Sequence, residues 1–202
     1  VVGDGTYPIT GRLGDIPALK VPTTEDGLVV IAVETMPSTL TYRKPEKFRN
    51  FVEHKKLGVD ADAQDYPFRE IYTRHVKSLI GVASGTGADR ALGLETEIIA
   101  LQNPFTDDLT NGLEVVVNLN NLPRAHVQIE VFEKAPDQTV SVFTLRSDAE
   151  GKAMVPVKPG HQYLLDAVTL RRPAERSLTG IASPADVEWE TLWAALTFEV
   201  PG

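Results

Sequence analysis

The chain has 202 residues, a formal net charge of −8 and a sequence pI of about 5.0. An acidic chain of this kind is not expected to bind nucleic acid in general, because contacts to phosphates require a basic surface. It contains no cysteine, which excludes disulfides, thiolate metal sites and cysteine nucleophiles. The length is enough for one domain of sandwich size and a smaller one.

We expect neither a membrane-spanning segment nor a targeting signal within these residues. No run of about twenty apolar residues is present, so no transmembrane segment is predicted. The chain starts at Val1 without a methionine or a basic leader, and we expect that any targeting signal has been removed or left out. Residues 1–24 are rich in Gly, Pro, Asp and Thr, which indicates loops or short edge strands.

The first half of the chain predicts two strands and then a helix. Residues 28–33 are strongly apolar, and residues 39–42 are rich in residues that favour strands. Pro45 suits a first helical turn, and Gly58 suits the end of a helix. We therefore expect a helix over residues 45–57.

The segment after Pro67 is ambiguous. Phe68, Ile71, Tyr72 and His75 share a helical stripe, while residues 76–82 fit either a continued helix or a strand. Both alternatives stay open at this point. Residues 84–89 then read Ser-Gly-Thr-Gly-Ala-Asp, which is typical of a linker, and no Gly-Lys-Ser/Thr follows to form a phosphate-binding loop.

The second half predicts a β-sandwich. Seven segments with β-forming residues are separated by turns, at residues 95–101, 113–119, 125–133, 140–145, 152–157, 162–170 and 191–200. In one of them Val127, Ile129 and Val131 alternate with His126 and other polar residues, so His126 should face solvent. The fold class is therefore mainly β. We expect a C-terminal seven-stranded immunoglobulin-like or transthyretin-like sandwich over residues 92–202, and a smaller N-terminal β-rich unit over residues 1–84 with one or two helices.

Catalytic and metal-binding motifs are weak. No Gly-x-Ser-x-Gly elbow is present, and we expect no enzyme. Three aspartates at positions 60, 62 and 65 lack the glycine and the glutamate of a calcium loop, so a solvated acidic loop is favoured. The histidines lie far apart and none has a second histidine at ligand spacing. His75, His126 and His161 are the candidate metal ligands, with His54 as a further imidazole, and a surface or packed histidine is the alternative for each.

Two further features allow more than one interpretation. Residues 43–56 hold six Lys or Arg against two Glu, which fits either a docking site for an acidic partner or a solvated helix face. Trp189 and Trp193 could stack against a ligand, although closing the core of a sandwich is the commoner role of such aromatics.

Several short stretches, taken together, resemble the DUF4198 family over nearly the whole chain. They are Pro37-Ser38-Thr39-Leu40, Pro45-Glu46-Lys47-Phe48, Tyr72-Thr73-Arg74, the turn at residues 147–151, Tyr163-Leu164-Leu165 and the ending of residues 189–198. The resemblance implies a secreted, periplasmic protein, because many members are labelled NikM-like or as periplasmic components of cobalt or nickel ABC transport systems. Members often carry a histidine near the mature N-terminus and another on the strand matching residues 163–170, where this chain has Thr169.

The leading hypothesis is thus a non-enzymatic periplasmic binding or accessory protein. The resemblance implies a link to cobalt or nickel uptake and, as partner, a metal transporter or an outer-membrane receptor. The alternatives are an adhesion or protein-interaction module without metal and, less favoured, a carbohydrate-active enzyme. Co and Ni prefer imidazole ligands, so four scattered histidines predict no tight intrinsic metal site.

Overall fold

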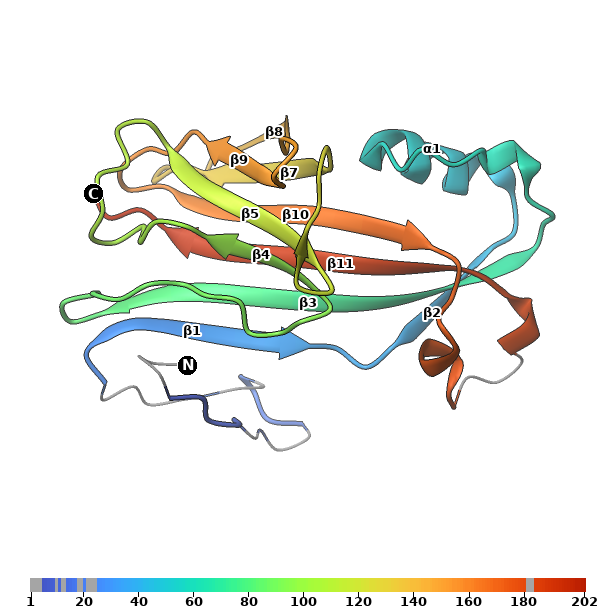
Figure 1. Cartoon of the computed structure of the whole chain (residues 1–202), viewed down its shortest axis with the longest axis horizontal. Helices are drawn as coiled ribbons and strands as arrows, with labels where there is room; N and C mark the ends of the chain where they lie inside the picture. Colours follow the sequence, from blue (N-terminus) through green and yellow to red (C-terminus); the bar gives the residue numbers. More distant parts are fainter. Residues whose placement is uncertain (1–4, 10, 12–13, 18–19, 21–24, 181–183) are drawn as a thin grey trace.

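The computed structural model of the chain describes residues 5–9, 11, 14–17, 20, 25–180 and 184–202 (Figure 1). The loops or short edge strands expected over residues 1–24 lie partly outside these ranges. The described elements are β1 (Gly27–Glu34), β2 (Ser38–Tyr42), α1 (Pro45–Lys55), η1 (Ala61–Ala63), β3 (Phe68–Val82), β4 (Thr96–Ala100), β5 (Leu113–Leu119), β6 (Leu122–Pro123), β7 (Gln128–Lys134), β8 (Val140–Arg146), β9 (Lys152–Val155), β10 (Gln162–Arg171), η2 (Glu175–Leu178), η3 (Pro184–Asp186) and β11 (Val187–Glu199).

Two sheets form the molecule. The larger has seven strands in the order β1-β3-β11-β10-β7-β8, with β2 also paired to β3. The smaller has the order β4-β5-β6, with β9 also paired to β5. β3 and β11 run parallel, and the other paired strands run antiparallel. The protein is therefore a mainly β sandwich, and all seven strands predicted between residues 95 and 200 are confirmed.

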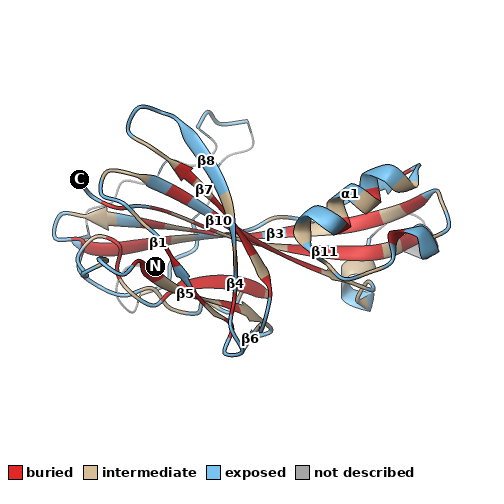
Figure 2. Ribbon diagram, turned by 90° about the horizontal axis from the view of Figure 1, so that it is seen from above, coloured by how far each residue is buried: buried red, intermediate tan, exposed pale blue. Residues whose placement is uncertain are grey.

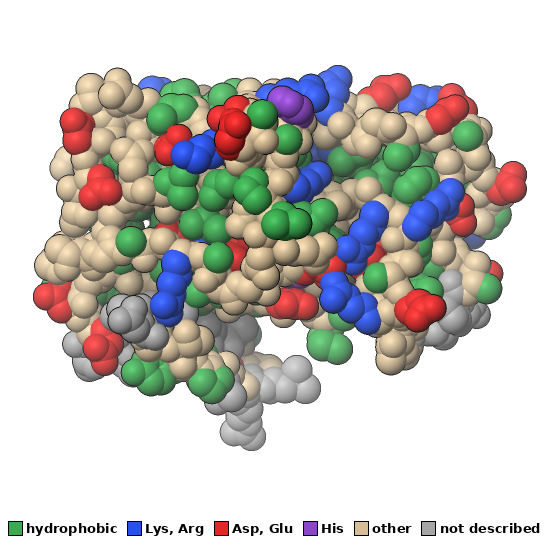
Figure 3. Space-filling view, in the orientation of Figure 1, with side chains coloured by type: hydrophobic (Ala, Val, Ile, Leu, Met, Phe, Trp, Pro, Cys, Tyr) green, Lys and Arg blue, Asp and Glu red, His purple; other side chains and the backbone are tan. Residues whose placement is uncertain are grey.

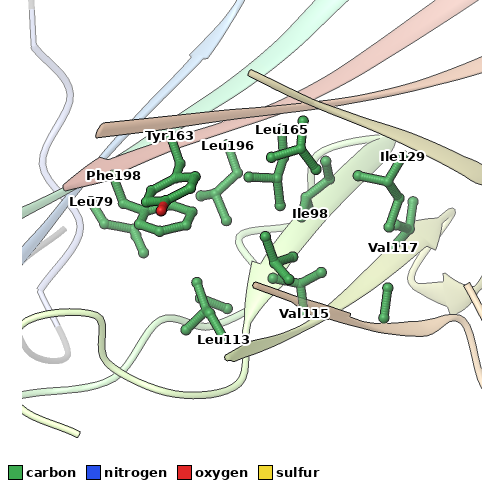
Figure 4. Packing of buried hydrophobic residues seen from close by; sticks show 14 of the residues in the cluster. Leu79, Ile98, Leu113, Val115, Val117, Ile129, Tyr163, Leu165, Leu196 and Phe198 are labelled. Carbon is green, nitrogen blue, oxygen red and sulfur yellow. The ribbon is translucent and has the colours of Figure 1, made fainter. Parts of the chain in front are cut away.

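The main core lies between the two sheets. Figure 4 shows Leu165 and Leu196 of the large sheet turned toward Val115 and Ile98 of the small one. Alternate residues point to opposite sides of a strand, so one side of each large-sheet strand supplies this core. The predicted side of β7 is confirmed, because Val127, Ile129 and Val131 are buried. The turn at residues 147–151 is confirmed as well: the Asp148 carboxylate accepts the Lys152 amide at 2.8 Å, and Gly151 has a φ of 74°.

Helix α1 packs on the other side of the large sheet, at one end. Figure 2 shows α1 and the strands β4 and β5 on opposite sides of β3 and β11, whose ends beside α1 project beyond the small sheet. Phe48 is fully buried there, in a second apolar cluster that includes Phe68 and Trp189. Trp193 stacks on Phe51 with a ring separation of 5.8 Å. Trp189 is thus a packed core residue, as predicted, but it lies in the cluster under α1 and not in the sandwich core between the two sheets. The helix begins at Pro45 as predicted and ends at Lys55, two residues before the predicted end.

The ambiguous segment after Pro67 is a strand of 15 residues, β3, so its helical alternative is wrong. It pairs with β1 on one side and with β11 on the other, and these partners outweigh the local helical spacing. Ile71, His75 and Leu79 are buried on the side of β3 that faces the small sheet. One α-helix, α1, is present among the described residues.

An ion-pair group inside the core joins β3 to the segment before β4. The Lys77 ammonium lies 2.7 Å from Asp89 and 3.0 Å from Glu97, and all three side chains are at most 1% exposed. The Asn103 amide donates to the carbonyls of Gly85 and Gly87. These contacts hold residues 84–89 against the core.

The division of the chain into units of residues 1–84 and 92–202 stays a prediction. Strands from both of these ranges belong to the large sheet.

Candidate functional site

The half of the large sheet that α1 leaves open carries several exposed apolar side chains. Because side chains alternate along a strand, residues next to the core positions point away from the small sheet. On this side Ile80 and Leu164 are each 39% exposed, Val142 is 52% exposed and Val140 is 54% exposed. We call this surface the open half.

A groove of about 500 Å³ crosses the open half. It runs over five neighbouring strands, β3, β11, β10, β7 and β8, and its lining includes Ile80, Glu199, Leu164, Phe132, Lys134 and Val140. Ile80, Leu164, Phe132 and Val140 supply apolar side chains, and the polar residues Ser78, Thr197 and Gln162 also line the groove. The Lys134 ammonium has no ion-pair partner among the described side chains, whereas the Glu199 carboxylate accepts a hydrogen bond from Gln162 at 3.2 Å. The groove thus combines an apolar floor with a cation and an anion at its end.

The last turn of α1 borders the open half with a buried charged cluster. The Lys55 ammonium donates to the Glu130 carboxylate at 2.6 Å and also to Asp166. Glu130 and Asp166 stand opposite each other on β7 and β10. The three side chains are between 7% and 11% exposed, and the ammonium lies 5.3 Å from the centre of the Trp193 ring.

The pKa values in this cluster follow from its burial and its partners. Burial raises the pKa of Asp166, and the single ammonium of Lys55 does not fully reverse this effect. Burial also acts to raise the pKa of Glu130, but hydrogen bonds from Lys55 and His54 outweigh it and the pKa lies below its usual value. Burial would lower the pKa of Lys55, yet the two carboxylates hold it above its usual value. The cluster is therefore an ion-paired support that fixes the end of α1 to the sheet.

The structure does not bring the candidate metal ligands together. His126 is exposed, as predicted, in the loop before β7 with a φ of 57°. His161 lies 2.7 Å from Glu133, but the Lys158 ammonium lies at the same distance from the same carboxylate oxygen. His75 is buried, and its ring lies 3.9 Å from Glu34. His54 meets Glu130 at 2.8 Å, where Lys55 also binds. Across the described parts of the chain, no three His, Asp or Glu side chains are grouped so that they could hold a metal ion.

His75 has an unusual environment. Its side chain is 1% exposed, and neither ring nitrogen has a hydrogen-bond partner among the described residues. Burial lowers the pKa of His75, which favours the neutral imidazole. This histidine is a packed residue of the core side of β3 rather than an accessible ligand.

Aspartates of the acidic loop and some of the basic residues near α1 make hydrogen bonds and ion pairs within the molecule. Asp60 and Asp62 are exposed, and Asp60 accepts the backbone amide of Asp62 at 2.9 Å. Asp62 in turn pairs with Arg49 of α1. Since Lys55 is also paired, the exposed basic residues left on and around α1 are Arg43, Lys44, Lys47 and Lys56.

Three further arginines lie at and just after the end of β10, in a region where Figure 3 shows several basic side chains. Arg171 bridges Glu95 and Glu190, with 2.7 Å to each. Arg176 also pairs with Glu95, and Arg172 pairs with Glu188. Because these arginines are matched with acids, they form an ion-pair network rather than an open anion site.

Sequence reasoning missed most of the groove and its border. Glu130 lies on the side of β7 opposite Ile129 and Val131, yet it is only 5% exposed because the end of α1 covers it. Asp166 stands between Leu165 and Ala167 in the middle of β10, and a buried carboxylate of this kind normally has a cationic partner. That signal could have pointed to Lys55. The open half itself needs the pairing of five strands, which no local pattern shows.

Comparison with protein families gives a match of residues 1–171 to the family described as "Domain of unknown function (DUF4198)". Comparison with curated proteins and with solved structures gives no match. Among the described residues, no helix has both the length and the apolar character needed to span a membrane.

Proposed function

We propose that this chain, which belongs to the DUF4198 family, is a non-enzymatic binding or accessory module. In this role it holds a protein partner on the open half of the large sheet. The observation that carries the proposal is the apolar groove across β3, β11, β10, β7 and β8. Contiguous apolar surface on soluble proteins commonly marks a place of interaction, because exposing it to water is unfavourable.

The shape of the groove favours a protein segment over an enclosed small molecule. Pockets for small ligands bury most of the ligand surface. Here the lining comes from the strands of one sheet, and no residue of α1 contributes to it. A convex partner segment with apolar side chains would fill the groove, and a carboxylate on that segment would meet the ammonium of Lys134.

A single charge in the groove tests this proposal. Leu164→Glu places a carboxylate on the apolar floor, and because Leu164 is already 39% exposed the fold should tolerate it. The matched control is Leu122→Glu on β6, where the side chain is 69% exposed and lies away from the groove. Each protein is used to capture partners from a periplasmic extract, and a captured protein is identified, purified and titrated.

Wild-type protein and the Leu122→Glu control should bind the purified partner with the same affinity, and Leu164→Glu should bind at least about tenfold more weakly. If Leu164→Glu binds as tightly as the wild type, the open half is not the interface. Failure of the wild type to retain any partner would also contradict the proposal.

A periplasmic location and a link to cobalt or nickel uptake are supported by the resemblance to NikM-like members. In such a role the chain would act as an accessory to a transporter, since ammonium groups already occupy its histidine and carboxylate pairs at Glu130 and Glu133. A metal ion would have to displace Lys55 or Lys158 to bind there. Titration calorimetry of Ni²⁺ and Co²⁺ should therefore show only weak binding, and submicromolar, stoichiometric binding would contradict this expectation.

A further inference from the structure

β8 forms an outer edge of the large sheet. It pairs with β7 on one side, and no described strand pairs with its other side. Natural edge strands are usually protected by proline, by charges or by a bulge. The β8 sequence, Val-Ser-Val-Phe-Thr-Leu-Arg, has no proline, no acidic residue and one basic residue at its end. Its pairing with β7 shows no break in register. The edge is thus open to another strand.

The register with β7 determines which backbone groups of β8 face outward. The amide of Ala135 donates to the carbonyl of Thr139 at 2.9 Å, which makes this pair a hydrogen-bonded pair of the hairpin. Hydrogen-bonded and non-hydrogen-bonded pairs alternate along an antiparallel ladder. Residues 141, 143 and 145 therefore bond to β7, and the amides and carbonyls of residues 140, 142, 144 and 146 point away from the sheet.

We propose that a second copy of this chain pairs with β8 in an antiparallel arrangement, with a twofold axis at Phe143. In this register Val140 stands opposite Arg146 of the other copy, and Val142 stands opposite Thr144. All four outward-facing residues then form hydrogen-bonded pairs, which gives about eight backbone hydrogen bonds between the copies. The axis is perpendicular to the sheet, so the open halves of both copies lie on the same side.

The edge is self-complementary in charge as well as in hydrogen bonding. Antiparallel pairing places Arg146 beside the start of the other β8, next to the turn that carries the exposed carboxylate of Asp137. The contact occurs twice by symmetry, and no two like charges stand directly opposite each other on the paired strands. A second copy satisfies these conditions without any further requirement, which is the reason to prefer it over a strand of another protein.

The contact is small, and this sets the expected affinity. Seven residues of paired strand extend about 23 Å. Such a contact belongs to the small, transient class of interfaces, so we expect a dissociation constant in the micromolar range. Each copy carries a net charge of −8, whose repulsion is largely screened at about 0.15 M salt. This inference does not depend on the proposed function.

The first test measures self-association by sedimentation equilibrium from about 1 to 500 μM in 0.15 M salt. Val142→Pro removes an amide that points outward, so it should block the second copy and leave the β7–β8 ladder intact. Val142→Thr changes the side chain and keeps the amide. We expect the wild type and Val142→Thr to dimerise and Val142→Pro to weaken dimerisation at least tenfold. A wild type that stays monomeric at 500 μM, or a Val142→Pro that dimerises equally well, would overturn the proposal.

The second test checks the register and does not depend on the folding of the proline variant. Ser141 of one copy should stand opposite Leu145 of the other in a non-hydrogen-bonded pair, where side chains approach most closely. The chain has no cysteine of its own. A mixture of Ser141→Cys and Leu145→Cys chains should therefore form mixed disulfide dimers on mild oxidation, and each variant alone should form few. Equal crosslinking in all three samples, or none in the mixture, would contradict the proposed pairing.

Discussion

Replacing Lys77 by methionine should destabilise the protein more than most single substitutions. The ammonium of Lys77 is fully buried between Asp89 and Glu97, which are themselves 0% and 1% exposed. Lys77→Met keeps much of the volume of the side chain but leaves two carboxylates inside the core without their cation. Removing one partner from a buried ion pair costs about 3–5 kcal/mol, because the remaining charge cannot be solvated.

Backbone hydrogen bonds to the two carboxylates should keep the loss of stability in the lower part of this range. The amides of Leu92 and Ala100 donate to Glu97 and Asp89 at 2.9 Å, so each carboxylate keeps at least one donor after Lys77 is lost. We therefore expect Lys77→Met to lower the free energy of unfolding by about 3 kcal/mol. Adding Asp89→Asn and Glu97→Gln removes both charges, while the amide oxygens can still accept from the backbone. The triple variant should recover at least about 1 kcal/mol relative to Lys77→Met.

Urea unfolding at pH 7 measures the free energy of unfolding of each variant and so tests this prediction. The two tryptophans of the chain, Trp189 and Trp193, report it through their fluorescence because both lie on β11 next to α1. An exposed control such as Met36→Ala, at a side chain that is 84% exposed, should change stability by less than about 0.5 kcal/mol. The reasoning is refuted if Lys77→Met costs less than about 1 kcal/mol, or if the triple variant is no more stable than Lys77→Met alone.

Three further outcomes follow from single positions. His75 has a lowered pKa in the folded state, so below the ordinary imidazole pKa of about 6.5 the unfolded chain binds a proton that the folded chain does not. Stability should fall from pH 7 to pH 5, and His75→Gln should flatten that slope in urea titrations; an unchanged slope would contradict the assignment. Phe48→Ala should cost about 3–5 kcal/mol, because Phe48 is fully buried under α1. Gly112→Ala should cost about 1–3 kcal/mol more than Gly58→Ala in the same assay, since an added Cβ at Gly112 lies 2.6 Å from the carbonyl oxygen of Val155 and nothing lies within 4 Å at Gly58.

The strands of the second half could be predicted because their signals are local. Alternating side chains and turn residues identify β7 and its buried face within a few positions, and the turn at Asp148 and Gly151 follows from two residues. β3 shows the opposite case. The apolar residues from Phe68 to His75 fit the spacing of a helix as well as that of a strand. The segment forms a strand because β1 and β11 pair with it. β11 lies more than a hundred residues further along the chain, so no local pattern contains it.

The candidate site was hidden for a related reason. Lys55 reads as one of six basic residues near a helix, and Glu130 reads as an outward-facing strand residue. Their contact arises because the last turn of α1 reaches β7 and β10, where Asp166 stands opposite Glu130. The open half follows from the same arrangement, since α1 has 11 residues and extends about 16 Å.

Whether the rest of the large sheet needs a partner can be argued from these dimensions. A helix of about 16 Å spans about three strand spacings of 4.8 Å, whereas the large sheet is six strands wide along its main path. Contacts of Lys55 and Phe48 also hold the helix at one end of the long strands. The helix therefore does not reach the far end of β3. One helix of this length cannot cover the sheet. The apolar side chains at Ile80, Val142 and Leu164 are thus exposed by the architecture of the chain itself, and a second molecule is what could bury them.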